Sequence, residues 1–295
     1  MKSPPALSPD SLPSRNQGRV CIALAALLWS TSGAFTKMLT TDTGLGLDLP
    51  PVPALAIAFY RVLFAGLVLV PLMRRRDVSF RPLMLVMAAS FAVMNVLFVT
   101  AMAWGPAANA ILLQYTAPMW MYLASIWLLG EAPDRRGSIA LAVGLLGIAV
   151  IVAGGWGSEQ VPVIVIALGS GVAYAGVMIC LRVLRDASSR WLTIINHLCG
   201  ALVLLPLLFW QTSPTGPQLL VLFVFGAVQM GLPYWLAARG LRSVSPQEAG
   251  TITLLEPILN PLWAYLVAGD LPPSLTFVGG AFILGALAWR YWPRR

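Results

Sequence analysis

The feature that most constrains this chain is a series of long apolar blocks. An α-helix rises roughly 1.5 Å per residue, so about 20 apolar residues cross the ~30 Å hydrocarbon core of a bilayer. Only 10% of the 295 residues are charged, whereas soluble domains carry about 25%. An ordinary soluble protein is excluded, because its surface needs many more polar residues.

The blocks predict an all-α membrane protein with ten transmembrane helices. Short connections join the spans, so no separate soluble domain remains to carry its own chemistry. The predicted spans are Val20–Leu39, Val52–Met73, Leu83–Ala103, Ala107–Leu129, Ile139–Ala153, Val161–Leu181, Trp191–Trp210, Leu219–Leu236, Pro246–Ala268 and Ser274–Tyr291.

The basic residues predict an orientation. With ten spans, 17 of the 19 Lys and Arg residues fall on one side of the membrane, and only Lys37 and Arg61 lie within spans. Lys and Arg collect on the cytoplasmic side, so both termini are predicted to be cytoplasmic. The net charge of +8 then reflects topology, and no nucleic-acid partner is expected. The Ser- and Pro-rich segment 1–18 is predicted to be a disordered cytoplasmic tail, and 293–295 a second tail.

The two halves of the chain resemble each other. Four residues recur 139 positions later: Pro118, Gly130, Glu131 and Pro133 match Pro257, Gly269, Asp270 and Pro272. A weaker match pairs Trp29 and Lys37 with Tyr174 and Arg182. Each repeat, 19–155 and 156–292, holds five spans, and because five is odd the second repeat is inverted in the membrane. The Gly-acid pairs are expected to end helices.

These repeats, the stretch Trp29-Ser30-Thr31-Ser32-Gly33 and the duplicated Pro…Gly-acid…Pro run resemble the EamA family of the drug/metabolite transporter superfamily. Within it, the chain is most similar to YddG-type exporters of aromatic and other amino acids. The resemblance spans about residues 20–292. It implies export of small metabolites across the inner membrane, through a cavity lined mainly by spans one, three, four, six, eight and nine.

Charged residues within spans are the first site candidates. A charge at the centre of a span costs roughly 2.5–3.5 kcal/mol on insertion scales, so such residues tend to be functional. Glu256 shares a helix face with Thr253, Asn260 and Trp263. It is predicted either to contact a substrate amine or titrate, or else to form a structural pair with Arg61 or with a backbone donor. His197 is the third candidate for proton or charge coupling, and Lys37 is expected to snorkel to the outer boundary.

Prolines within spans point to the same region. Pro118, Pro233, Pro257 and Pro261 each free a backbone carbonyl four residues earlier, which predicts bent helices around a wet cavity. The predicted substrate-binding residues are Trp29, Ser32, Asn95, Gln114, Tyr115, Tyr174, Met178, Gln229, Glu256, Asn260 and Trp263. Spans five and ten, with their glycines, are assigned to the scaffold or to a homodimer contact rather than to the site.

Other functions fit the residues less well. One histidine, scattered cysteines and one central carboxylate provide neither a catalytic set nor a metal site, so no enzyme activity, cofactor or metal is expected. The predicted function is a secondary transporter that exports aromatic and other neutral amino acids by alternating access. The alternatives are export of purines, organic cations or nucleotide-sugars, and a channel. The expected partners are a small-molecule substrate and the lipid bilayer.

Overall fold

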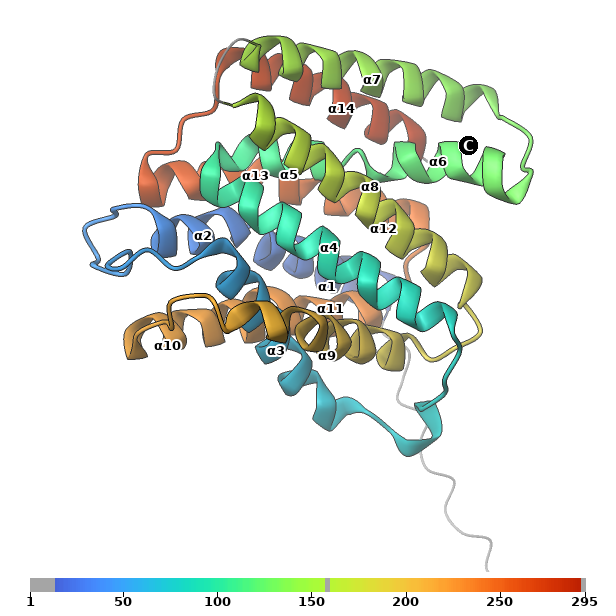
Figure 1. Ribbon diagram of the computed structural model, residues 1–295. Coiled ribbons are helices and arrows are strands. Elements are labelled where there is room, and N and C mark those ends of the chain that lie inside the picture. The colour runs from blue at the N-terminus through green and yellow to red at the C-terminus, as the bar shows by residue number, and fades with distance from the viewer. Residues whose placement is uncertain (1–13, 157–159, 293–295) are drawn as a thin grey trace, which may run out of the picture.

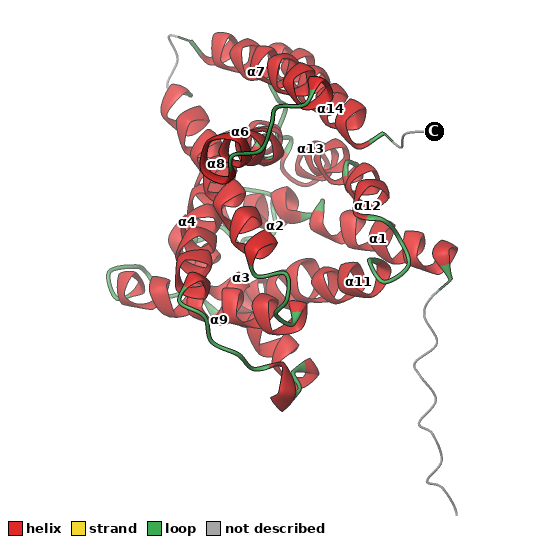
Figure 2. Ribbon diagram, turned by 90° about the vertical axis from the view of Figure 1, so that its right-hand side faces the viewer, coloured by secondary structure: helices red, strands yellow, loops and turns green. Residues whose placement is uncertain are grey.

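The computed structural model describes residues 14–156 and 160–292, and within them it contains helices and no strands. Figures 1 and 2 show these helices stacked across one another, with α7 and α14 together at one edge. The α-helices are α1 (Arg15–Trp29), α2 (Ser32–Thr40), α3 (Ala54–Leu69), α4 (Leu83–Trp104), α5 (Ala107–Gln114), α6 (Ala117–Leu129), α7 (Arg135–Gly155), α8 (Val161–Val183), α9 (Ser189–Leu208), α10 (Gly216–Val224), α11 (Leu232–Gly240), α12 (Pro246–Thr253), α13 (Leu255–Ala268) and α14 (Ser274–Tyr291). Short 3₁₀ turns η1 (Val70–Leu72) and η2 (Arg75–Asp77) follow α3, and a π-helix, η3 (Phe225–Gly231), joins α10 to α11.

Nine stretches of helix within the described residues are long and apolar enough to cross a membrane. The expected span Ala107–Leu129 is present as two shorter helices, α5 and α6, with Tyr115 and Thr116 between them. Many large apolar side chains on the outer surface are exposed, including Leu67, Leu202 and Phe277. Such a surface is unfavourable in water and suits contact with lipid.

The first helix begins earlier than predicted. Helix α1 starts at Arg15, inside the segment that we expected to be disordered, and a capping box between Ser14 and Gln17 satisfies its first amide groups. Arg15 and Arg19 also form ion pairs with Glu248, which fixes this end of α1 to α12. The prediction was wrong for residues 15–18, whereas residues 1–13 and the predicted tail 293–295 lie outside the described residues.

Several spans are interrupted near the middle, as three of the four prolines predicted, whereas α13 continues through Pro261. Helix α5 stops at Gln114 before Pro118, the π-helix η3 precedes Pro233, and α12 stops at Thr253 before Pro257. A proline removes an amide donor and displaces the carbonyl four residues earlier, so an interruption at these points is expected. A fourth interruption separates α1 from α2 at Ser30 and Thr31, where the sequence contains no proline.

The Gly-acid pairs end helices in both halves, as predicted. Gly130 after α6 and Gly269 after α13 both adopt the left-handed conformation, with φ values of 66° and 64°. Each amide then bonds back to the last turn of its helix, to Ser125 and Tyr265 respectively. A side chain would strain this conformation, which explains glycine at both positions.

The acidic residues that follow these glycines form ion pairs between the halves. Asp270 pairs with Lys37 at 3.6 Å, and Glu131 pairs with Arg182. Lys37 is buried and also donates to the Gly105 carbonyl oxygen at 2.9 Å, so the expectation that it snorkels is wrong. The repeat matches Lys37 with Arg182 and Asp270 with Glu131, so each ion pair is the counterpart of the other.

Helices α7 and α14 pack along their length at the edge of the molecule (Figure 1). At one end, Arg290 donates to Asp134 at 2.7 Å, and its guanidinium lowers the pKa of that carboxyl. Near the middle, Gly147 and Gly279 meet backbone to backbone, because a Cβ on Gly279 would lie 2.5 Å from the Gly147 carbonyl oxygen. Spans five and ten therefore pack through small residues, as predicted.

Replacing Gly279 with alanine should destabilise the protein by about 1–3 kcal/mol, because the new methyl group collides with backbone that cannot move aside. Gly285 lies on the same helix with nothing within 4 Å of its Cβ position, so Gly285→Ala is the matched control and should be neutral or mildly stabilising. The midpoint of thermal unfolding in detergent measures both variants. Equal midpoints would contradict close packing at this glycine pair.

Candidate functional site

A central cavity of about 410 Å³ lies among the interrupted helices. Residues from the broken spans α1–α2, α5–α6, η3–α11 and α12–α13 line it, together with residues of α3, α4, α8 and α14. Two hydrophobic clusters border the cavity: Met94 and Met230 belong to one, and Phe98 and Leu287 to the other. The volume falls within the range of about 300–1,000 Å³ that is typical of small-molecule sites.

Eight of the predicted substrate-binding residues share this cavity lining. They are Trp29, Ser32, Gln114, Tyr115, Tyr174, Met178, Gln229 and Glu256. Most of them flank a helix interruption, where the backbone is least regular. Such positions let polar groups point into a cavity at membrane depth while neighbouring protein satisfies the backbone.

The other three predicted residues are not among those that line the cavity. Their side chains form hydrogen bonds between the segments around it. Asn260 donates to the Ser32 hydroxyl at 2.8 Å, and Trp263 donates to the Ser30 hydroxyl at 2.9 Å. Both bonds tie α13 to the interruption between α1 and α2. Asn95 donates to the Ala58 carbonyl oxygen at 2.8 Å and so ties α4 to α3. In this structure these three side chains therefore connect helices around the cavity.

The prediction also missed several lining residues. The assignment of span ten to the scaffold alone is wrong, because Leu287 and Tyr291 of α14 reach the cavity. Tyr234 was missed as well, although it directly follows Pro233 in a span with a polar interruption. Arg61, which was predicted for charge coupling and not for substrate binding, also lines the cavity. The remaining lining residues outside the predicted set are Met94, Phe98, Pro118, Met121, Met230, Gly250, Thr253 and Leu254.

Two charged residues, Glu256 and Arg61, are among the described side chains that line the cavity. The Tyr115 hydroxyl donates to the Glu256 carboxylate at 2.7 Å. It also lies 3.0 Å from the Thr253 carbonyl oxygen, one of the carbonyls that a proline frees. Glu256 therefore has Tyr115 as its hydrogen-bond donor, and no ion pair between Glu256 and Arg61 occurs in the described structure.

Arg61 comes from α3 and is buried against aromatic rings. Its guanidinium carbon lies 5.7 Å from the centre of the Phe98 ring and 5.2 Å from that of Phe225. Cation–π contacts of this kind stabilise a buried guanidinium. Two of its nitrogens, Nε and Nη1, are buried without a hydrogen-bond partner among the described residues.

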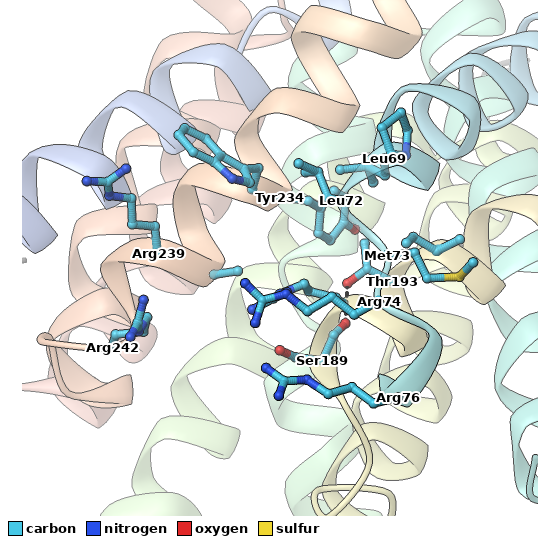
Figure 3. Close-up of a pocket in the computed structure, with 15 residues that line it drawn as sticks. Leu69, Leu72, Met73, Arg74, Arg76, Ser189, Thr193, Tyr234, Arg239 and Arg242 are labelled. Atoms are coloured by element: carbon cyan, nitrogen blue, oxygen red, sulfur yellow. Dashed lines mark hydrogen bonds between the residues drawn. The ribbon is translucent and has the colours of Figure 1, made fainter. Parts of the chain in front are cut away.

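A second, larger cavity of about 880 Å³ adjoins the first. We call it the arginine vestibule, because five arginines line it: Arg74, Arg76, Arg190, Arg239 and Arg242. In Figure 3, Arg74 and Arg76 come from one side, and Arg239 and Arg242 from the other. Tyr234 lines both cavities and so forms part of the wall between them.

His197 supports this wall instead of lining either cavity. Its ring packs edge-on against Tyr234 at 5.0 Å, and its Nδ1 lies 2.7 Å from the Thr193 carbonyl oxygen. Trp29 contacts Tyr234 from another direction, with ring centres 5.3 Å apart. The described residues contain no cluster of His, Cys, Asp and Glu that fits a metal ion.

Known proteins that resemble this chain in sequence include transporters. The model of the EamA-like transporter family matches residues 16–153 and 161–291. The pseudopaline exporter CntI of Pseudomonas aeruginosa is 27% identical over 276 residues, which cover 91% of this chain and 94% of that protein. The uncharacterized transporter YwfM of Bacillus subtilis is 25% identical over 290 residues, covering 93% and 94%. A solved crystal structure has the same fold, with a TM-score of 0.62 and 20% identity over 94% of this chain and 98% of the other.

Proposed function

Because the chain belongs to the EamA-like transporter family, we propose that it is a secondary transporter that exports amino-acid-like metabolites from the cytoplasm. The observation that carries the proposal is the central cavity, where helix interruptions from both halves meet and where polar, aromatic and methionine side chains mix. Inverted-repeat transporters bind their substrates between the halves in this way. The chain is a transporter and not an enzyme, like its described relatives.

We further propose ten spans in two inverted repeats, with both termini in the cytoplasm of the cell and the protein in the inner membrane. The family model matches two stretches of similar length, which supports the repeat. The distribution of arginines supports the orientation, because the arginine vestibule then faces the cytoplasm. The arginine vestibule lies beside the central cavity, and the buried Lys37–Asp270 ion pair joins the two halves away from the vestibule. We therefore propose that this state is inward-facing.

Neutral amino acids are the first substrate candidates. The carboxylate of Glu256 provides one charged contact for an ammonium group, and Trp29, Tyr174 and Met178 provide an adaptable apolar wall for a side chain. We propose that Glu256 either contacts the substrate amine or carries a coupled proton. A homodimer is part of the proposal, with spans five and ten (α7 and α14) as the contact that the sequence predicted.

A larger substrate is the second candidate, and two observations favour it. The relative CntI exports pseudopaline, and it aligns over nearly the whole chain. The cavity of about 410 Å³ is also in the range that accommodates drug-sized ligands, so it has room beyond a single amino acid. Pseudopaline therefore belongs in the same transport assay as the amino acids.

The test is efflux from proteoliposomes that contain the purified protein. Vesicles are loaded with labelled phenylalanine, tyrosine, threonine or methionine, and with pseudopaline in a parallel set, and the loss of label is followed over time. We expect saturable efflux of at least one neutral amino acid above that of protein-free vesicles. Efflux that rises linearly with concentration would favour a channel, which requires a continuous polar pore.

The outcomes separate the substrate classes. Efflux of pseudopaline alone would replace the amino-acid proposal with the second candidate. If folded protein transports neither, purines, organic cations and nucleotide-sugars form the next panel, and the proposal for amino-acid-like substrates fails. Gel filtration of protein recovered from the vesicles shows whether it is folded.

A further inference from the structure

Arg61 is a buried cation that the structure leaves without an anion. The residue is 4% exposed, and its Nε and Nη1 atoms have no hydrogen-bond partner among the described residues. A guanidinium stays protonated in proteins and carries five donors. Buried donors are nearly always satisfied, so two unsatisfied nitrogens on one buried charge require an explanation.

The position of Arg61 is held firmly by the surrounding helices. The rings of Phe98 and Phe225 flank its guanidinium. The backbone of α3 is tied to α4 by the bond from Asn95 to the Ala58 carbonyl oxygen, one turn before Arg61. The π-helix η3 approaches closely on another side, since a Cβ on Gly226 would lie 2.7 Å from the Arg61 carbonyl oxygen. These contacts hold the base of the side chain but leave Nε and Nη1 without a hydrogen-bond partner among the described residues.

Arg61 lines the same cavity as Glu256. The planar guanidinium matches the geometry of a carboxylate or a phosphate, to which it donates two parallel hydrogen bonds. The nearby negative charge of Glu256 disfavours a doubly charged phosphate and favours a ligand with one anionic and one cationic end. Among the described lining residues, these two supply the only formal charges, so the cavity as a whole suits a zwitterion.

We propose that Arg61 binds the carboxylate of the exported substrate, while Glu256 contacts its ammonium group. The proposal deepens the proposed function and rests on it, because it assigns the substrate class to the α-amino acids and their carboxylate-bearing derivatives. Carboxylate recognition by α3 and ammonium recognition by α13 place one contact in each half of the chain. A zwitterion then bridges the two halves that alternating access must move.

Binding to purified protein tests this proposal directly. Quenching of intrinsic tryptophan fluorescence, for which Trp29 lies in the cavity wall, measures affinity for matched pairs of a carboxylate and its amide. The pairs are phenylalanine with phenylalaninamide and threonine with threoninamide. We expect the wild-type protein to bind at least one carboxylate at least tenfold more tightly than its amide. In Arg61→Gln the ratio should fall to near one, through loss of affinity for the carboxylate.

Two further variants serve as controls for the loss of charge and for the loss of an arginine elsewhere. Arg61→Lys keeps the charge and loses the paired donors, so it should restore part of the preference. Arg136→Gln removes a partly buried arginine that contacts Trp289 outside both cavities, and it should leave the preference unchanged. Gel filtration and the midpoint of thermal unfolding show whether Arg61→Gln is folded. If it is not, the Arg61→Lys measurement decides: an undiminished carboxylate preference in that variant overturns the proposal.

The binding and efflux results can fail separately. Saturable amino-acid efflux by a wild-type protein that binds carboxylates and amides equally would uphold the proposed function and overturn the role of Arg61. An Arg61-dependent carboxylate preference without amino-acid efflux would uphold the anion site and overturn the proposed substrate. No carboxylate preference in any pair overturns the role of Arg61, whatever the efflux assay shows. An unchanged carboxylate preference in folded Arg61→Gln also overturns the role of Arg61. The guanidinium would then be only a structural contact for the two phenylalanines.

Discussion

Replacing Asp270 with asparagine is expected to lower the free energy of unfolding by about 3–5 kcal/mol, because it leaves the buried Lys37 ammonium without its anion. The side chains of Lys37 and Asp270 are only 9% and 14% exposed. The amide oxygen of the new asparagine can still accept the bond from the Ala107 amide that Asp270 accepts now, at 2.7 Å. The loss should therefore come mainly from the uncompensated charge. The midpoint of thermal unfolding in detergent reports it.

The repeat provides a matched control for this variant. Glu131 is the counterpart of Asp270, and its ion pair with Arg182 is 40–46% exposed. Exposed ion pairs contribute about 0–1 kcal/mol, so Glu131→Gln should change the midpoint little. The double variant Lys37→Met/Asp270→Leu removes both charges and should recover much of the stability lost in Asp270→Asn. Equal effects of Asp270→Asn and Glu131→Gln would show that burial does not distinguish the two pairs.

The Asp270→Asn variant should also change the balance between the states of the transport cycle. Lys37 of the first half and Asp270 of the second join the halves, and in the proposed orientation they lie near the outer boundary of the membrane. Weakening the pair should shift the population toward outward-facing states, because a ligand or contact present in one state stabilises that state.

Glu256→Gln is expected to reduce efflux of a zwitterionic substrate by about tenfold or more. Hydrogen bonds to charged groups contribute about 1.5–3 kcal/mol, and about 1.4 kcal/mol corresponds to a tenfold change in affinity. Glutamine retains the oxygen that accepts the Tyr115 hydroxyl, so the local structure should persist while the charge is lost. Initial rates of efflux at several substrate concentrations, with equal amounts of reconstituted protein, measure the change.

Two controls separate binding from packing and from proton coupling. Tyr115→Phe removes the hydroxyl but keeps the carboxylate and should have a smaller effect, whereas Tyr265→Phe changes a half-exposed tyrosine of α13 and should have none. Repeating the assay across a range of pH shows whether Glu256 titrates during transport. If Glu256→Gln leaves both the rate and its pH dependence unchanged, Glu256 neither binds the substrate nor carries a coupled proton.

Much of the fold followed from local sequence patterns. Apolar block length predicted the helices, because only a helix satisfies its own backbone in a bilayer. Proline positions predicted the interruptions before Pro118, Pro233 and Pro257, since the missing amide acts within one turn. The two Gly-acid pairs predicted helix ends for a similarly local reason. The prediction failed at Arg15, where a capping box and ion pairs with the distant Glu248 extend α1.

The sequence predicted the candidate site less completely than the fold. The three predicted residues that do not line the cavity show why. Asn95, Asn260 and Trp263 are polar or aromatic positions within spans, like Gln114 and Tyr174, and their helical spacing does not distinguish them. The difference is what lies opposite: a serine hydroxyl or a backbone carbonyl of another helix faces the first three, and the cavity faces the others. Helical periodicity defines a face of a helix but not its neighbour.

The sequence by itself therefore determined that this chain is helical and membrane-embedded, where three of its spans break, and which few polar residues lie within spans. Only the tertiary structure decided their partners: Lys37 with Asp270, Tyr115 with Glu256, and Arg61 with two phenylalanine rings and no anion among the described residues. Helix formation depends on residues within a few positions of one another, whereas these contacts join segments far apart in the chain. Their partners depend on how whole helices pack, which no single segment encodes.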